Sequence, residues 1–159
     1  TPLYSSAASD VYKRQDPERP TILFAHHPIT DDAVQSHLGG PSFMLERTQA
    51  AALQKILAAT PGAKAVFAGH THRNRRGVAD VGATDFCERG SSLGYPGGFT
   101  RIHIHTDGSQ VTYHRTRTPE SLAWSVKTRW SLFGLEPELM LGQISDRNYV
   151  QHYKIAVNT

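Results

Sequence analysis

The fold is decided by TILFAHHP at residues 21–28 and AVFAGHTH at residues 65–72. Each stretch opens on a mainly apolar run bounded by Pro or Gly, a pattern typical of a buried strand, and each closes on two histidines. In open α/β sheets, ligands bind beyond the carboxyl ends of the strands. The histidines therefore lie just past the two runs, where metal ligands would be useful, and imidazole nitrogen suits Zn, Fe, Mn and Ni sites.

The segment between the two runs predicts a helix. Apolar residues recur at three- and four-residue steps from Leu45 to about Thr60, and Pro61-Gly62 ends the pattern. Strand, helix and strand in this order are typical of a right-handed parallel crossover. If the chain stays extended beyond the second strand, His70 and His72 point to the same side.

Downstream, the pattern changes to short alternating segments. The expected strands are 76–81, 84–88, 99–105 and 110–115, with an Asp-Gly hairpin signature between the last two. His103 and His105 then share one face, which we interpret as the exposed face of an edge hairpin rather than a second metal site. An apolar and aromatic stripe from Leu122 to Phe133 predicts a helix that packs on the domain and ends at Gly134.

Length and composition limit the classes of protein. The chain has 159 residues, a formal net charge of +3 and a single cysteine, Cys87, so it forms one domain without an internal disulfide. No apolar run reaches the roughly 18 residues of a membrane span, and no basic stretch indicates a nucleic-acid partner. The compartment stays open, with a lean to the cytoplasm, and so does the oligomeric state.

A basic loop follows the second histidine pair at Arg73, Arg75 and Arg76. Such a loop is commonly a solvated turn. Beside a metal site it would also attract an anionic substrate, and Arg73 is our candidate for that contact.

Three segments resemble a known family. FAHHP at 24–28 and GHTH at 69–72 resemble the last two signature blocks of the calcineurin-like metallophosphoesterases, and GSSLGYPGGF at 90–99 resembles the segment that follows them. The resemblance covers residues 20–116. It implies an α/β fold, the C-terminal half of a metallophosphoesterase-like sandwich of two packed sheets with outer helices. Residues 1–18 are expected to be disordered or artefactual, 19–116 to form the phosphoesterase part, and 117–159 to form a helical extension.

The resemblance also implies a site and an activity. His26 and His70 would bind one metal ion and His72 a second, with Mn, Fe or Zn as the ions. His27 is the catalytic candidate, facing the substrate, although a structural role is equally open. The implied activity is hydrolysis of a small phosphate mono- or diester at a two-metal centre.

The chain departs from the family upstream of His26. The Asp-x-His, Gly-Asp-x-x-Asp and Gly-Asn-His-Asp/Glu blocks of the family are not found there. They would supply the remaining ligands, so we expect a fragment that is inactive by itself. The alternatives are a non-catalytic metallophosphoesterase-like binding or scaffold module, and a structural site for one metal.

Overall fold

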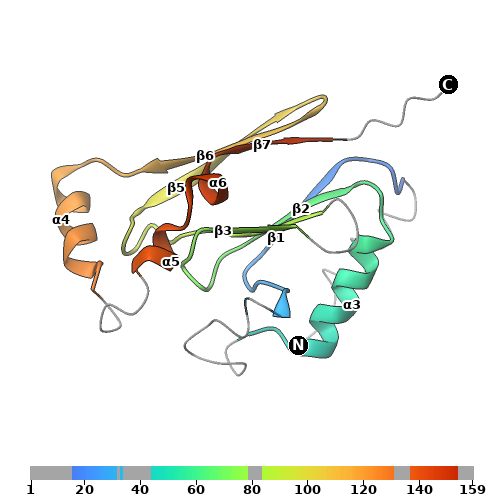
Figure 1. The fold of residues 1–159 in the computed structure, drawn as a ribbon, viewed down its shortest axis with the longest axis horizontal. Coiled ribbons are helices and arrows are strands. Elements are labelled where there is room, and N and C mark those ends of the chain that lie inside the picture. Colours follow the sequence, from blue (N-terminus) through green and yellow to red (C-terminus); the bar gives the residue numbers. More distant parts are fainter. Residues whose placement is uncertain (1–15, 32, 34–43, 79–83, 131–136, 154–159) are drawn as a thin grey trace.

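Two β-sheets lie face to face, and a long helix covers the outer face of the first sheet (Figure 1). The computed structural model describes residues 16–31, 33, 44–78, 84–130 and 137–153. The architecture is mixed α/β with two sheets, as the sequence predicted. Most of the expected N-terminal segment, residues 1–15, lies outside the described residues.

The first sheet is mainly parallel. Its strand order is β1-β2-β4-β3, with β1 at Thr21–Ala25, β2 at Ala63–Ala68, β3 at Arg75–Val78 and β4 at Asp85–Glu88. Strands β1, β2 and β4 run parallel, while β3 is antiparallel to β4. The carboxyl ends of the three parallel strands therefore meet at one edge of the sheet.

The second sheet is antiparallel, with order β5-β6-β7. Its strands are β5 at Gly98–His105, β6 at Gly108–Arg115 and β7 at Tyr149–His152. In the β5–β6 hairpin, His105 pairs with Gly108, so the turn consists of Thr106 and Asp107, where the sequence predicted it.

Strand β2 is the centre of the fold because all six of its residues are buried. Its side chains alternate between the two faces of the sheet. Val66 packs with Leu57 of helix α3 (Arg47–Ala58), while Ala65 and Phe67 pack with Val111 of the second sheet. The continuous apolar run is thus explained by a strand that is covered on both faces.

Helix α3 begins and ends close to the predicted bounds. The Glu46 carboxylate caps it by accepting hydrogen bonds from the backbone N–H groups of Thr48 and Gln49. Such a cap satisfies donors that have no partner inside the helix. The β1–α3–β2 unit therefore forms the parallel crossover that the spacing predicted.

The C-terminal segment contains more than the helical extension that was predicted. Helix α4 (Pro119–Thr128) is followed by α5 (Pro137–Leu141), α6 (Ile144–Arg147) and strand β7, which pairs with β6 in the second sheet. The Asp146 carboxylate accepts a hydrogen bond from the backbone N–H of Arg76 at 2.9 Å. This segment therefore joins both sheets rather than only covering one.

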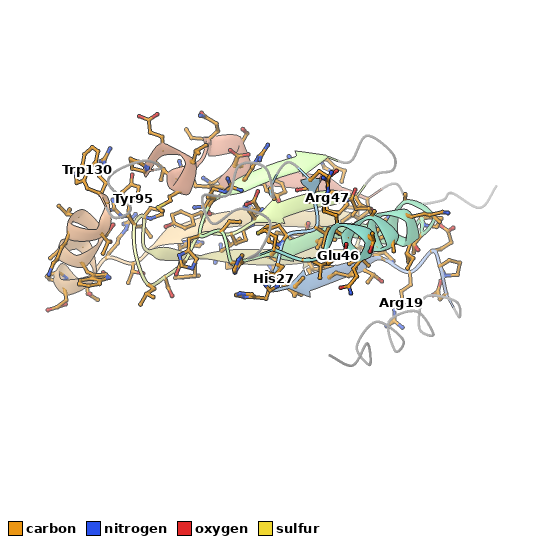
Figure 2. The ribbon with its side chains drawn as sticks, turned by 90° about the horizontal axis from the view of Figure 1, so that it is seen from below. Arg19, His27, Glu46, Arg47, Tyr95 and Trp130 are labelled. Atoms are coloured by element: carbon orange, nitrogen blue, oxygen red, sulfur yellow. The ribbon has the colours of Figure 1, made fainter. Side chains whose placement is uncertain are left out.

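The described part of the predicted stripe does not pack as expected, while Phe133 and the predicted helix end at Gly134 lie outside the described residues. Trp124 and Val126 are 48 % and 66 % exposed, and Trp130 lies near Tyr95 at one end of the molecule (Figure 2). The buried residue of α4 is Ser125, whose hydroxyl bonds the Pro96 carbonyl oxygen at 3.1 Å. The prediction failed because helical spacing of apolar residues does not show which side of a helix meets the domain. Among the described helices, none is both long and apolar enough to cross a membrane.

Candidate metal centre

The ends of β1 and β2 bring histidines from two distant segments together. Ala25 pairs with Ala68 at the last register position of the two strands. The Gly69 N–H then donates to the His26 carbonyl oxygen at 3.0 Å, which extends the ladder by one bond. His26 and His70 are therefore neighbours although 44 residues separate them.

Three imidazoles converge at this edge. The Nε2 atom of His26 lies 3.1 Å from Nδ1 of His70, and one ring nitrogen from each of His26, His27 and His70 lies within 4.8 Å of the others. Two nitrogens bound to one zinc ion at about 2.0–2.1 Å and a tetrahedral angle are separated by about 3.3 Å. The His26–His70 pair is close to this separation, while the wider limit of 4.8 Å for all three means that the rings would draw closer together around a single ion.

The His70–His72 turn has an unusual backbone. His70 has φ of 65° and His72 has φ of 58°, while the Thr71 N–H donates to the Gly69 carbonyl oxygen at 2.7 Å. Positive φ is uncommon outside glycine, and such strain concentrates at functional sites. The chain therefore turns sharply here, instead of leaving β2 in the extended form that the sequence predicted.

This turn changes which histidines meet. The sequence predicted convergence of His26, His70 and His72, but the structure gathers His26 and His70 with His27 in the third position. His72 is exposed and lines a groove beside the cluster. The expected alternation of side chains across an extended strand does not hold where two residues occupy the left-handed region.

The environment of His27 favours its neutral form. Burial lowers the pKa of His27, and the neighbouring charges of His70 and His26 lower it further. The neutral imidazole is the form that ligates metals. His27, predicted as a catalytic residue, is therefore equally well placed to be a ligand.

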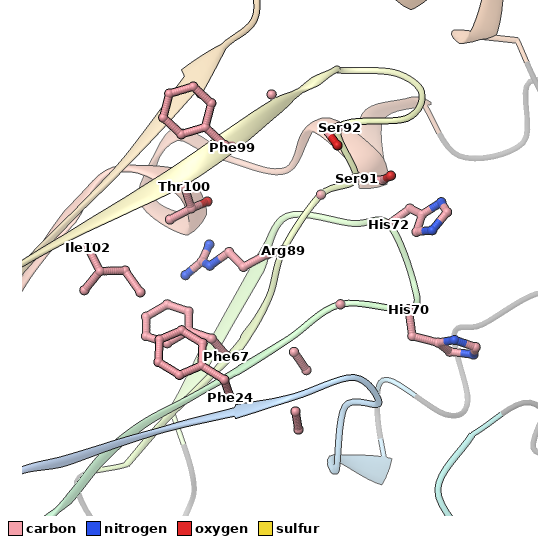
Figure 3. A pocket seen from close by; sticks show the side chains of 15 residues that line it. Phe24, Phe67, His70, His72, Arg89, Ser91, Ser92, Phe99, Thr100 and Ile102 are labelled. Atoms are coloured by element: carbon pink, nitrogen blue, oxygen red, sulfur yellow. The ribbon is translucent and has the colours of Figure 1, made fainter.

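A groove of about 480 Å³ opens between the two sheets next to the histidines (Figure 3). Phe24 and Phe67 stack on its floor with ring centroids 5.7 Å apart, and Ile102 and Thr100 of β5 lie opposite. The groove has the volume typical of sites for small molecules. His70 and His72 lie at one end of it, with their rings pointing away from the phenylalanines.

Arg89 lines the groove beside the histidines and was not predicted from the sequence. It directly follows β4, so it stands at the same sheet edge as the histidines, and its guanidinium lies 5.1 Å from the Phe67 ring centroid. Its Nη1 and Nη2 atoms donate to the Asp146 carbonyl oxygen and the Tyr149 hydroxyl. The feature of the sequence that could have identified Arg89 is its position directly after a third buried strand, β4.

Arg73 does not occupy the position that was predicted for it. Its side chain is 2 % exposed, and its Nη2 and Nε atoms bond one oxygen of Glu88 at 2.7 and 3.1 Å. It does not line the groove. The loop is basic in sequence but largely neutralised in the fold, since Arg76 likewise pairs with Asp85 at 2.8 Å. Arg73 is thus part of a buried ion pair, and its placement argues against contact with substrate.

The donor set at this edge consists of imidazoles. Within the described part of the chain, no carboxylate oxygen joins the group of three histidines. Nitrogen ligands of this kind fit a transition metal ion. Comparison of the chain with protein-family models, with curated protein sequences and with solved structures gave no significant match.

Proposed function

We propose that this chain carries the histidine part of a metal-dependent phosphoesterase centre that hydrolyses phosphate mono- or diesters. The observation that carries the proposal is the convergence of His26, His27 and His70 at the carboxyl ends of two parallel strands. The resemblance of FAHHP and GHTH to calcineurin-like metallophosphoesterases supports the same reading, as does the face-to-face pair of sheets. On this proposal the fold is the C-terminal half of that family's sandwich.

The residues of this chain would act mainly as ligands. His26, His27 and His70 would hold one ion, and His72, exposed at the same turn, is the residue that would approach a second. Two bound ions would activate water at neutral pH and offset the charge of the phosphoryl oxygens. The lowered pKa of His27 favours the ligand form, because a protonated imidazole has no free lone pair.

Hydrolysis at two metals also requires oxygen ligands. Because the histidine group includes no described carboxylate, the proposal requires acidic ligands from outside this group. The described residues by themselves are therefore expected to bind metal without turnover.

The groove supports a small organic substrate. Its floor of Phe24 and Phe67 is apolar, and the Arg89 guanidinium lies above Phe67. An apolar organic group would be covered there, while the cation would favour an anionic ester. Phosphate esters of small alcohols or phenols match this combination.

The test measures hydrolysis of p-nitrophenyl phosphate and bis-p-nitrophenyl phosphate with Mn²⁺, in the protein expressed from its complete gene. Replacing His70 with Ala should abolish hydrolysis, whereas the control His152→Ala, at an exposed position on β7, should keep it. Hydrolysis that survives His70→Ala would contradict the proposal.

A non-catalytic binding module is the second candidate. The absence of a described carboxylate from the histidine group favours it, since one ion on three imidazoles suffices for binding. The same experiment separates the two: metal that binds through His70 with no hydrolysis of either ester would support the binding module.

A further inference from the structure

The outer face of β5 carries a second pair of histidines, far in sequence from the cluster at the strand ends. His103 and His105 are both exposed, and their ring centroids are 4.6 Å apart with an interplanar angle of 52°. Strand β5 is at the edge of the second sheet, so no described strand covers its other side.

The strand places the two rings on the same face and close together. Residues two apart on a strand share a face, with Cα atoms about 6.6 Å apart. The backbone is fixed by pairing of His103 with Gln110 and of His105 with Gly108. A Cβ at Gly108 would collide with the backbone oxygen of Gln151, so the position paired with His105 is restricted to glycine and carries no side chain.

The sequence alone favoured an exposed hairpin face over a metal site here, but because the two rings lie 4.6 Å apart we propose that His103 and His105 form a bidentate site for a divalent transition-metal ion, with Cu²⁺ bound more tightly than Ni²⁺ or Zn²⁺. The order follows the general affinity of nitrogen sites for these ions. Two imidazoles would supply two coordination positions, and water would fill the others. The site is independent of the proposed phosphoesterase centre, because it lies on the other sheet and shares no residue with it.

The charges around the pair moderate its affinity. Arg101 shares the face of β5 with the two histidines, two residues before His103, and its charge opposes the binding of a cation. With two ligands and a cation nearby, this site should bind more weakly than the group of three histidines.

The test is calorimetric titration of the chain with Cu²⁺ at pH 7.5 in wild type, His70→Ala, His103→Ala and the double variant His70→Ala/His103→Ala. His103→Ala should weaken the binding of Cu²⁺ at the weaker class of sites and leave the tighter class unchanged. Because the second imidazole binds within the same molecule, its loss should weaken this class by about tenfold or more. His105→Ala should have the same effect.

His114→Ala is the matched control, since His114 lies on the same sheet but pairs with Phe99, four residues before His103, and its ring stacks on that of Phe99 with centroids 5.3 Å apart. It should titrate as wild type does. The proposal is overturned if both His103→Ala and His105→Ala titrate as wild type. The same titration tests the cluster of His26, His27 and His70 separately, because His70→Ala should remove the tighter class of Cu²⁺ sites.

Discussion

Replacing Arg73 with Met removes the cation from the most deeply buried ion pair among the described residues. The side chains of Arg73 and Glu88 are 2 % and 7 % exposed, and two guanidinium nitrogens bond the same carboxylate oxygen. A third bond joins Nη2 to the Ala33 carbonyl oxygen at 3.4 Å. The variant therefore leaves a carboxylate in the interior and a carbonyl oxygen with one donor fewer.

The expected loss of stability is large. Two opposite charges about 4 Å apart attract each other by about 4 kcal/mol at an effective dielectric constant of about 20. Breaking a buried pair by removing one partner costs about 3–5 kcal/mol, because the remaining charge stays desolvated. With a denaturant slope of about 2 kcal/mol per molar urea, the unfolding midpoint should fall by about 2 M.

The assay is urea unfolding followed by circular dichroism, with Arg75→Met as the matched control. The Arg75 side chain is 38 % exposed and lies 4.0 Å from the other oxygen of Glu88, so its loss should cost less than about 1 kcal/mol. The double variant Arg73→Met/Glu88→Leu should be less destabilised than the sum of its single variants by about 1–3 kcal/mol. If the urea midpoint of Arg73→Met is no lower than that of Arg75→Met, the buried structural role of Arg73 is refuted, and Arg73 would instead be a surface cation.

Three further predictions concern the core and the ionisable groups around it. Cys87 is buried and burial raises the pKa of its thiol, so Ellman's reagent should modify it only as urea unfolds the chain, and rapid modification without urea would count against this burial. Leu57→Ala should lower the free energy of unfolding by about 2–5 kcal/mol, while Ile56→Ala, at a side chain 46 % exposed on the same helix, should cost far less; equal losses would mean that α3 does not pack as described. Burial raises the pKa of the Asp85 carboxyl from 3.8, although Arg76 opposes the shift. Its stabilising contribution is thus fully present below pH 3.8 and is lost as pH rises through the higher folded-state pKa. The free energy of unfolding of wild type minus that of Asp85→Asn should therefore fall across this window, and a difference that rises with pH would exclude the shift.

The local patterns of the sequence predicted much of the fold. Strands β1 and β2, helix α3 and the β5–β6 hairpin follow from periodicity and from turn residues, which act within a few positions. Strand β7 was not predicted, because YVQH is short and is specified by pairing with β6 rather than by its own pattern. The exposed face of α4 was also misjudged, since burial of Ser125 depends on a distant contact with Pro96.

The candidate site was predicted only in part, because some of its features do not follow from local sequence patterns. The register of two parallel strands places His26 beside His70, and both strands were recognisable. The left-handed conformation at His70 and His72 exchanges His72 for His27 in the cluster, and no residue type in GHTH required that conformation. The burial of Arg73 depends on Glu88, which is 15 residues away and on a different strand.

On our proposal, three imidazoles at the carboxyl ends of β1 and β2 bind one metal ion. X-ray absorption spectroscopy of the zinc-loaded chain, in the His103→Ala/His105→Ala background that removes the second pair, tests it directly. We predict a zinc shell with scattering from about three imidazoles at about 2.0–2.1 Å, of which one is lost in His70→Ala. A zinc shell with one imidazole or none, or a shell that His70→Ala leaves unchanged, would contradict the claim.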